Sequence, residues 1–129
     1  MEIGFWFFML FGELMIPVTM IFFGKRFLEQ APKNINLWYG YRTKRSMKNR
    51  ETWAFAHQYI GKLWLRLGWV TLIVSLVPMA LLFGKDIATV GTVGFVLVFL
   101  QIIPLVAPII LTERALKQNF DQYGRRKAV

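Results

Sequence analysis

The sequence predicts an all-α membrane protein with three transmembrane helices and a structured basic cytoplasmic loop between the first and second. The chain is 56% hydrophobic over 129 residues with a mean hydropathy of +0.44, more than a soluble core of this size needs. Its apolar residues fall into three runs, at about 3–23, 63–83 and 87–111. As a helix rising about 1.5 Å per residue, each run can cross a hydrocarbon layer of roughly 30 Å. We therefore expect a single three-span membrane domain over residues 1–129.

The first run has the flanks of a retained helix. A secretory signal carries positive charge before its apolar stretch and a small-residue cleavage site after it. Here Glu2 precedes the run, and Lys25 and Arg26 follow it. The pattern predicts a membrane helix with its N-terminus outside the cell.

Positive charge is concentrated in two of the connecting segments. The 24–62 segment holds nine lysines and arginines against two acids, and the 112–129 segment holds five against two, whereas the turn after the second run is nearly neutral. Because cytoplasmic loops carry the excess of Lys and Arg, we predict that the loop 24–62 and the tail 112–129 are cytoplasmic. The net charge of +9 then lies beside anionic lipid headgroups, so a direct nucleic-acid partner is not expected.

The second run is expected to continue a helix that begins inside the loop. Ser46 or Asn49 can cap that helix, and Glu51 would lie in its first turn, where the helix dipole favours an acid. Apolar residues then recur at helical spacing into the run: Trp53, Ala56, Ile60, Leu63 and Leu67. Two arrangements remain open, a single helix of about 35 residues or a bend at Gly61 that lays the first part on the membrane.

A motif occupies the second half of the loop. It reads Gly40-Tyr41-Arg42-Thr43, then Ser46-Met47-Lys48-Asn49, Glu51-Thr52-Trp53, Ala56 and Gly61-Lys62. This order resembles the signature of the SdpI/YfhL family of small bacterial membrane proteins. The tail, with Thr112-Glu113-Arg114, Phe120-Asp121 and Gly124, is similar to the family's ending. Lys44 stands where the family often has proline.

The resemblance implies a function, a location and a set of binding residues. The family includes an immunity protein that protects a bacterium from its own secreted membrane-active peptide toxin and captures a small repressor at the membrane. We therefore expect an integral immunity protein of the bacterial inner membrane, with lipid, a peptide toxin and a small repressor as partners. The expected binding residues, for a partner or a headgroup, are Arg42, Thr43, Ser46, Lys48, Asn49, Glu51, Trp53 and Lys62.

Simpler interpretations of these residues stay open. Arg42, Arg45 and Lys48 can either neutralise bilayer phosphates or line a defined binding pocket. Glu51 can pair locally with Lys48 or Arg50. His57, the one histidine, is expected to be a packing residue.

A few polar residues lie inside the apolar runs. Glu13 is at the centre of the first, where an ionisable group costs about 2.5–3.5 kcal/mol, so it should face protein. Counted from the cytoplasmic ends, Glu13 and Gln101 both lie roughly 15 Å deep, and Ser75 lies near the same level. We predict that a protonated Glu13 hydrogen-bonds Gln101 or Ser75, with Arg66 as the alternative charged partner.

No catalytic residues, metal ligands or cofactor motif are predicted. The chain has no cysteine, no HExxH, no GxxxxGK[ST] and no serine/histidine pairing with an orienting acid. In the tail, Glu113 and Arg114 are candidates for an ion pair at the membrane interface. Two other functions remain open. One is a lipid- or envelope-modifying enzyme that holds a phosphate headgroup with the Arg42–Trp53 loop, and the other is a membrane anchor for a small transcriptional repressor.

Overall fold

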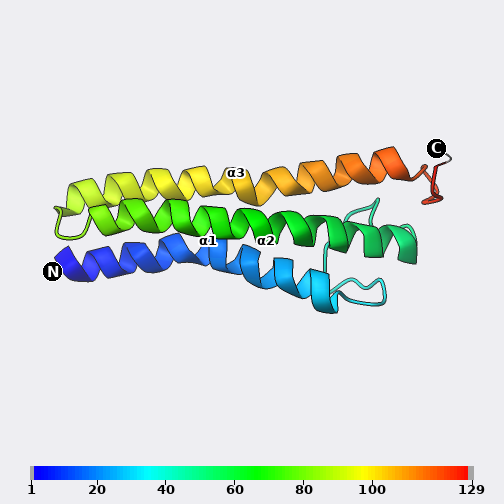
Figure 1. The fold of residues 1–129 in the computed structure, drawn as a ribbon, viewed down its shortest axis with the longest axis horizontal. Helices are drawn as coiled ribbons and strands as arrows, with labels where there is room; N and C mark the ends of the chain where they lie inside the picture. The colour runs from blue at the N-terminus through cyan, green and yellow to red at the C-terminus, as the bar shows by residue number, and fades with distance from the viewer. Residues whose placement is uncertain (1, 128–129) are drawn as a thin grey trace.

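The computed structural model describes residues 2–127 and contains three long helices, α1 (Glu2–Gln30), α2 (Arg50–Leu81) and α3 (Ile87–Asn119). The helices lie side by side, and α1 begins at the opposite end of the bundle from the end of α3 (Figure 1). The connection 31–49 joins α1 to α2 at one end, called the loop end here, and the short turn 82–86 joins α2 to α3 at the other, the turn end. The predicted all-α fold with three long helices is confirmed.

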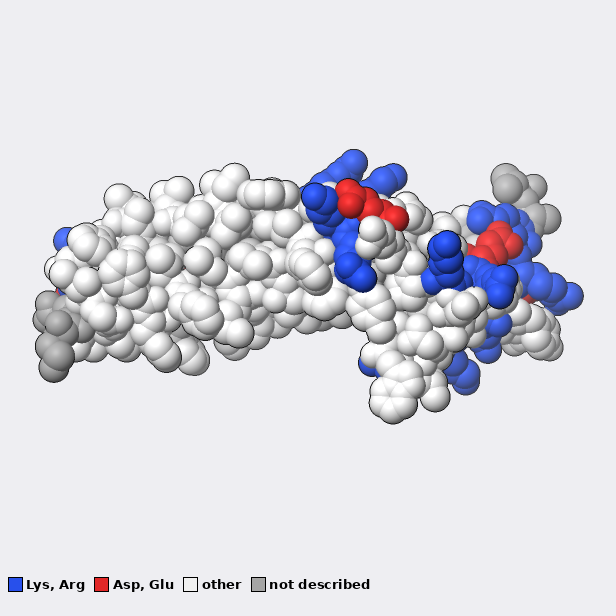
Figure 2. Space-filling model, turned by 90° about the horizontal axis from the view of Figure 1, so that it is seen from below, with Lys and Arg blue, Asp and Glu red and all other residues white. Residues whose placement is uncertain are grey.

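All three helices are long and apolar enough to cross a membrane. Large apolar side chains point outward from each of them, among them Phe8 at 70% exposure, Leu81 at 73% and Phe95 at 71%. Such a surface is unfavourable in water but ordinary against lipid. Figure 2 shows a surface without charged side chains over much of the molecule's length, with most of the charged side chains gathered toward the loop end. The chain is built as a multi-pass membrane protein.

The helices extend beyond the predicted spans. α1 continues through Lys25 and Arg26 to Gln30, which was not predicted, whereas α2 begins at Arg50, inside the loop as predicted. The non-helical connection is therefore 31–49. Hydropathy locates the lipid-facing stretch, whereas helix ends depend on caps and tertiary contacts. α2 also runs through Gly61 as one helix of 32 residues, which decides between the two predicted arrangements.

Glycines let α1 and α2 approach closely near the loop end. A Cβ on Gly24 would lie 2.6 Å from Leu65 N and 2.9 Å from Gly61 O. A Cβ on Gly61 would in turn lie 3.0 Å from Gly24 O. Because small residues allow membrane helices to pack backbone against backbone, this contact holds the end of α1 against α2, directly beneath the connection.

The turn end is simpler. Trp6 donates its indole N–H to Met79 O at 2.8 Å, joining the start of α1 to the end of α2. Asp86 caps α3, accepting the Thr89 hydroxyl at 2.6 Å. Met79 and Val90 are 0% and 1% exposed in the small core there. This end therefore has one tight turn and no extended surface segment.

Candidate functional site

The middle of the connection is anchored on α3. Tyr41 donates its hydroxyl to Glu113 Oε2 at 2.5 Å, and Thr43 donates its hydroxyl to the same oxygen at 2.8 Å. Burial, followed by the hydrogen bond to the Glu113 carboxylate, raises the pKa of Tyr41 above its usual range. The phenol therefore stays protonated and remains a donor. Two hydroxyls of the connection thus share one carboxylate of a distant helix.

α2 holds the same segment from its other side. The Tyr41 backbone N–H donates to His57 Nε2 at 2.9 Å, so Nδ1 carries the proton of a neutral ring and donates to Trp53 O at 2.8 Å. The Trp53 indole donates to Pro32 O at 2.6 Å. Gly40 has φ +118°, and a Cβ there would lie 2.8 Å from His57 Nε2, so only glycine fits. As predicted, His57 is a packing residue, and it also accepts a backbone hydrogen bond.

Asn49, and not Ser46, caps α2. Asn49 Oδ1 accepts the Thr52 backbone N–H at 2.9 Å, and Thr52 Oγ1 accepts the Asn49 backbone N–H at 3.0 Å, which completes a capping box. Ser46 is fully buried and donates its hydroxyl to Tyr41 O at 2.9 Å. Its side chain therefore closes the turn that precedes the helix.

The chain after α3 packs on the start of α2. Asn49 Nδ2 donates to Gly124 O at 2.7 Å. Glu51 lies in the first turn of α2, as predicted, but it forms its ion pair with Arg126 of the tail, at 2.6 Å, and not with Lys48 or Arg50. The tail thus contacts both the N-cap residue and the first turn of α2.

Glu113 and Arg114 point in different directions. Adjacent helical residues are about 100° apart around the helix, so Glu113 turns toward the connection while Arg114 is exposed. Within residues 2–127 no ion pair joins them; the ion pairs there are Arg125–Asp121 and Arg126–Glu51. Glu113 accepts hydroxyl donors in place of the predicted charged partner.

The other predicted binding residues separate into a group that is buried or part-buried and a group that is exposed. Four of them build the folded connection: Thr43, Ser46, Asn49 and Trp53. Arg42 is exposed and donates to the carbonyl of Leu37, bracing the connection internally. Lys48 and Lys62 are exposed and have no hydrogen bond or ion pair from their side chains within the described residues.

A pocket of about 520 Å³ opens where the connection, α3 and the tail meet. We call it the loop pocket, and its lining residues are Lys44, Arg45, Lys48, Glu113, Gln122 and Tyr123. Three cations around one hollow suit an anionic group, either a phosphate or acidic side chains of a protein. Of this set, Lys48 was predicted as a binding residue and Glu113 only as half of an ion pair. The charge run that includes Lys44 and Arg45 was a usable signal, whereas nothing in the sequence indicated that the tail would reach it.

A second polar cluster lies inside the bundle. Gln101 Nε2 donates to Ser75 Oγ at 2.7 Å, to Glu13 O at 2.8 Å and, more weakly, to Glu13 Oε2 at 3.5 Å. Ser75, Glu13 and Gln101 are 2%, 0% and 3% exposed, respectively. Glu13, Gln101 and Ser75 lie at one depth, as predicted, but the short hydrogen bond from Gln101 goes to the backbone carbonyl of Glu13 and not to its side chain. The protonated state of Glu13 stays a prediction. Arg66, the alternative partner, is exposed and makes no contact of this kind with Glu13.

These features define a class of protein: a three-helix membrane protein whose basic connecting segment is folded and braced by α2, α3 and the tail. Among residues 2–127, no three His, Cys, Asp or Glu side chains are grouped as a metal site would require. The profile of the SdpI/YfhL protein family matches residues 33–112, which include most of the connection, all of α2 and most of α3.

The chain is also similar to a curated bacterial protein. YfhL of Bacillus subtilis (strain 168), described as uncharacterized, is 36% identical over 103 residues, covering 73% of this chain and 80% of that protein. The chain belongs to the SdpI/YfhL family. No solved structure matches it.

Proposed function

We propose that this protein is a membrane immunity or defence factor that protects its cell from a membrane-active peptide toxin. Family membership supports a membrane immunity-type protein. The observation that carries the proposal is the folding of the family motif. Tyr41 and Thr43 are held on Glu113, and Tyr41 is also held on His57. Attraction to anionic lipid requires charge alone, so such fixed geometry supports recognition of a specific partner.

The mechanism we favour is stoichiometric. The apolar bundle meets the toxin peptide, or the lipid it attacks, within the membrane. The loop pocket, with Lys44, Arg45 and Lys48, then holds an acidic partner on the side of the membrane where the loop end lies. The expected partner is a small repressor protein. Protection would then rise with the number of copies of this chain.

The proposal places the loop end in the cytoplasm, with the N-terminus outside a bacterial inner membrane. The charge asymmetry between the loop end and the Lys85–Asp86 turn supports this orientation. The chain has no native cysteine, so single cysteines can be introduced directly. A cysteine at Lys85 should react with an impermeant thiol reagent added to intact cells, and one at Lys44 should react only after lysis. The reverse pattern would overturn the orientation.

Graded expression in a toxin-sensitive host tests the function. Survival against membrane-active peptides should increase in proportion to the amount of protein in the membrane. The triple variant Lys44→Ala, Arg45→Ala, Lys48→Ala should lose protection at equal abundance. The matched variant Lys33→Ala, Arg50→Ala, Arg114→Ala removes three exposed basic residues that do not line the loop pocket, and it should keep protection. Survival unchanged at every expression level, for all peptides tried, would contradict the proposal.

A headgroup-modifying enzyme is the second candidate, because the loop pocket combines three cations with a carboxylate. One oxygen of that carboxylate already accepts two hydroxyl donors from the connection, so the contacts of Glu113 support a structural role more than a catalytic one. The enzyme alternative requires product formation when purified protein is incubated with labelled phospholipid, and protection at copy numbers far below that of the toxin. A repressor anchor would instead co-purify a small DNA-binding protein, and the triple variant would lose it.

A further inference from the structure

A groove of about 530 Å³ lies on the outer surface of α1, beside α2, where the apolar stretch of α1 meets its first charges. It shares no residue with the loop pocket or with the polar cluster inside the bundle. Its apolar half includes Val18 and Phe22 of α1 and Trp69 of α2, which are 51%, 57% and 52% exposed. These side chains belong to helices that face lipid, so the apolar half is open to an acyl chain.

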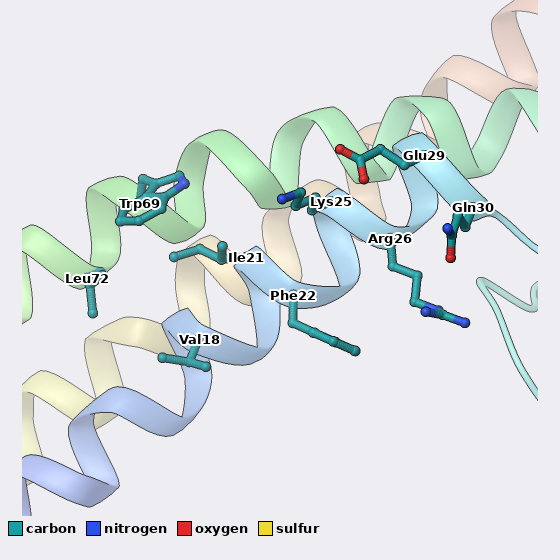
Figure 3. A pocket seen from close by; sticks show the side chains of 9 residues that line it. All are labelled: Val18, Ile21, Phe22, Lys25, Arg26, Glu29, Gln30, Trp69 and Leu72. Atoms are coloured by element: carbon teal, nitrogen blue, oxygen red, sulfur yellow. The ribbon is translucent and has the colours of Figure 1, made fainter.

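The polar half of the groove carries two cations and one acid. Figure 3 shows Lys25 and Glu29 on the side of α1 that faces α2, and Arg26 on the other side, above Phe22. All three charged side chains are exposed, and none forms an ion pair or side-chain hydrogen bond within residues 2–127. The groove therefore presents both signs of charge to a ligand.

The position of the groove selects an amphipathic ligand. Lys25 and Arg26 directly follow the apolar run 3–23, and the same face of α1 is apolar one turn deeper. Tryptophan is enriched at the level of lipid headgroups, and Trp69 lines this groove. A ligand that fills both halves needs a chain in the membrane and a charged group at its surface.

We infer that this groove binds a phospholipid whose head group carries a phosphate and a primary ammonium, the chemistry of phosphatidylethanolamine. On the side of α1 that faces α2, the Lys25 ammonium donates to the phosphate and the ammonium of the head group donates to the Glu29 carboxylate. Arg26, on the other side of α1, adds positive charge at the rim of the groove. A purely anionic head group would leave Glu29 unused and face its negative charge. A quaternary ammonium has no N–H to donate. The inference is independent of the immunity proposal.

Trp69 supplies the readout. The full chain is reconstituted in bilayers of phosphatidylcholine brominated on its acyl chains, which quenches nearby tryptophans. Unbrominated phosphatidylethanolamine, phosphatidylglycerol or phosphatidylcholine is then added in separate series, and the Trp69 signal is the difference between the native chain and Trp69→Phe. Phosphatidylethanolamine should restore the signal at a mole fraction about two- to fivefold lower than either other lipid, as expected from one exposed ion pair.

Exposed substitutions then test the assigned contacts without disturbing the core. Glu29→Gln should abolish the preference for phosphatidylethanolamine over phosphatidylglycerol. The double variant Lys25→Gln, Arg26→Gln should weaken the binding of both lipids. Lys33→Gln, an exposed lysine outside the groove, should change neither. Equal behaviour of the three head groups would overturn the site. A preference for phosphatidylglycerol that survives Glu29→Gln would overturn the assigned ligand.

Discussion

Two glutamates, the part-buried Glu113 and the buried Glu13, occupy very different environments in this protein. Glu113, at the loop end, accepts the hydroxyls of Tyr41 at 2.5 Å and Thr43 at 2.8 Å. Glu13, inside the bundle, is 0% exposed, yet its side chain has only the 3.5 Å contact from Gln101. Its second oxygen, Oε1, is buried without a hydrogen-bond partner among the described residues.

The difference follows from what surrounds each carboxylate. At the loop end, the irregular connection can place two hydroxyls on one oxygen because its backbone is not confined to a helix. Inside the bundle, Glu13 meets only the side chains that α2 and α3 present at its level. A satisfied carboxylate fixes structure, whereas an unsatisfied one retains hydrogen-bonding capacity for a ligand or a proton. We therefore assign Glu113 to the fold and regard Glu13 as the glutamate with spare capacity.

The largest expected effect is that of Glu113→Leu. It would remove the acceptor of the part-buried Thr43 hydroxyl and leave the Tyr41 hydroxyl with only its 3.4 Å contact to Ile109 O. Because a buried donor without a good partner costs about 1–3 kcal/mol, the loss at Tyr41 should dominate. Thermal unfolding in detergent should shift downward, and protease should cut within 31–49 far faster than in the native chain. The neighbouring variant Arg114→Leu, at an exposed position, is the control and should change neither quantity much. Unaltered protease resistance in Glu113→Leu would mean that α2 alone holds the connection.

An intermediate effect is expected for Gln101→Leu. It removes the donor that Ser75 Oγ and Glu13 O share, and hydrogen bonds between membrane helices contribute about 0.6–1.7 kcal/mol. The free energy of unfolding should fall by that amount. The protease resistance of residues 31–49 should be unchanged, because the connection lies at the loop end, away from Gln101. Faster cleavage of 31–49 would show that the two polar clusters are coupled.

The smallest expected effect is that of Glu13→Leu. Gln101 would keep Ser75 Oγ and the Glu13 backbone carbonyl as acceptors, so the free energy of unfolding should change by less than about 0.6 kcal/mol. Toxin survival should be measured on the same variant beside Glu13→Gln. Loss of protection at unchanged stability would show that the spare oxygen of Glu13 is used in function. A destabilisation as large as that of Glu113→Leu would remove the contrast between the two glutamates.

Part of the site was predictable from the chain alone. The depth of Glu13 and Gln101 follows from counting residues along helices of fixed rise, and the structure joins them through Gln101 Nε2. The motif around Gly40 and Trp53 marked the connection as special, but it did not reveal that most of those residues are internal braces. Exposed ligands and buried braces have the same residue types, and only their surroundings distinguish them.

The sequence by itself determined the three helices and the basic character of one end, because hydropathy, caps and charge are properties of neighbouring residues. It also determined the limits of the apolar runs, although not where the helices stop. Only the tertiary structure decided that Tyr41 and Thr43 meet Glu113, that Arg126 pairs with Glu51, and that Gln122 joins Lys44 in one pocket. These contacts join segments far apart in the chain. No periodicity records them, because each depends on how an irregular connection and a tail fold against helices already in place.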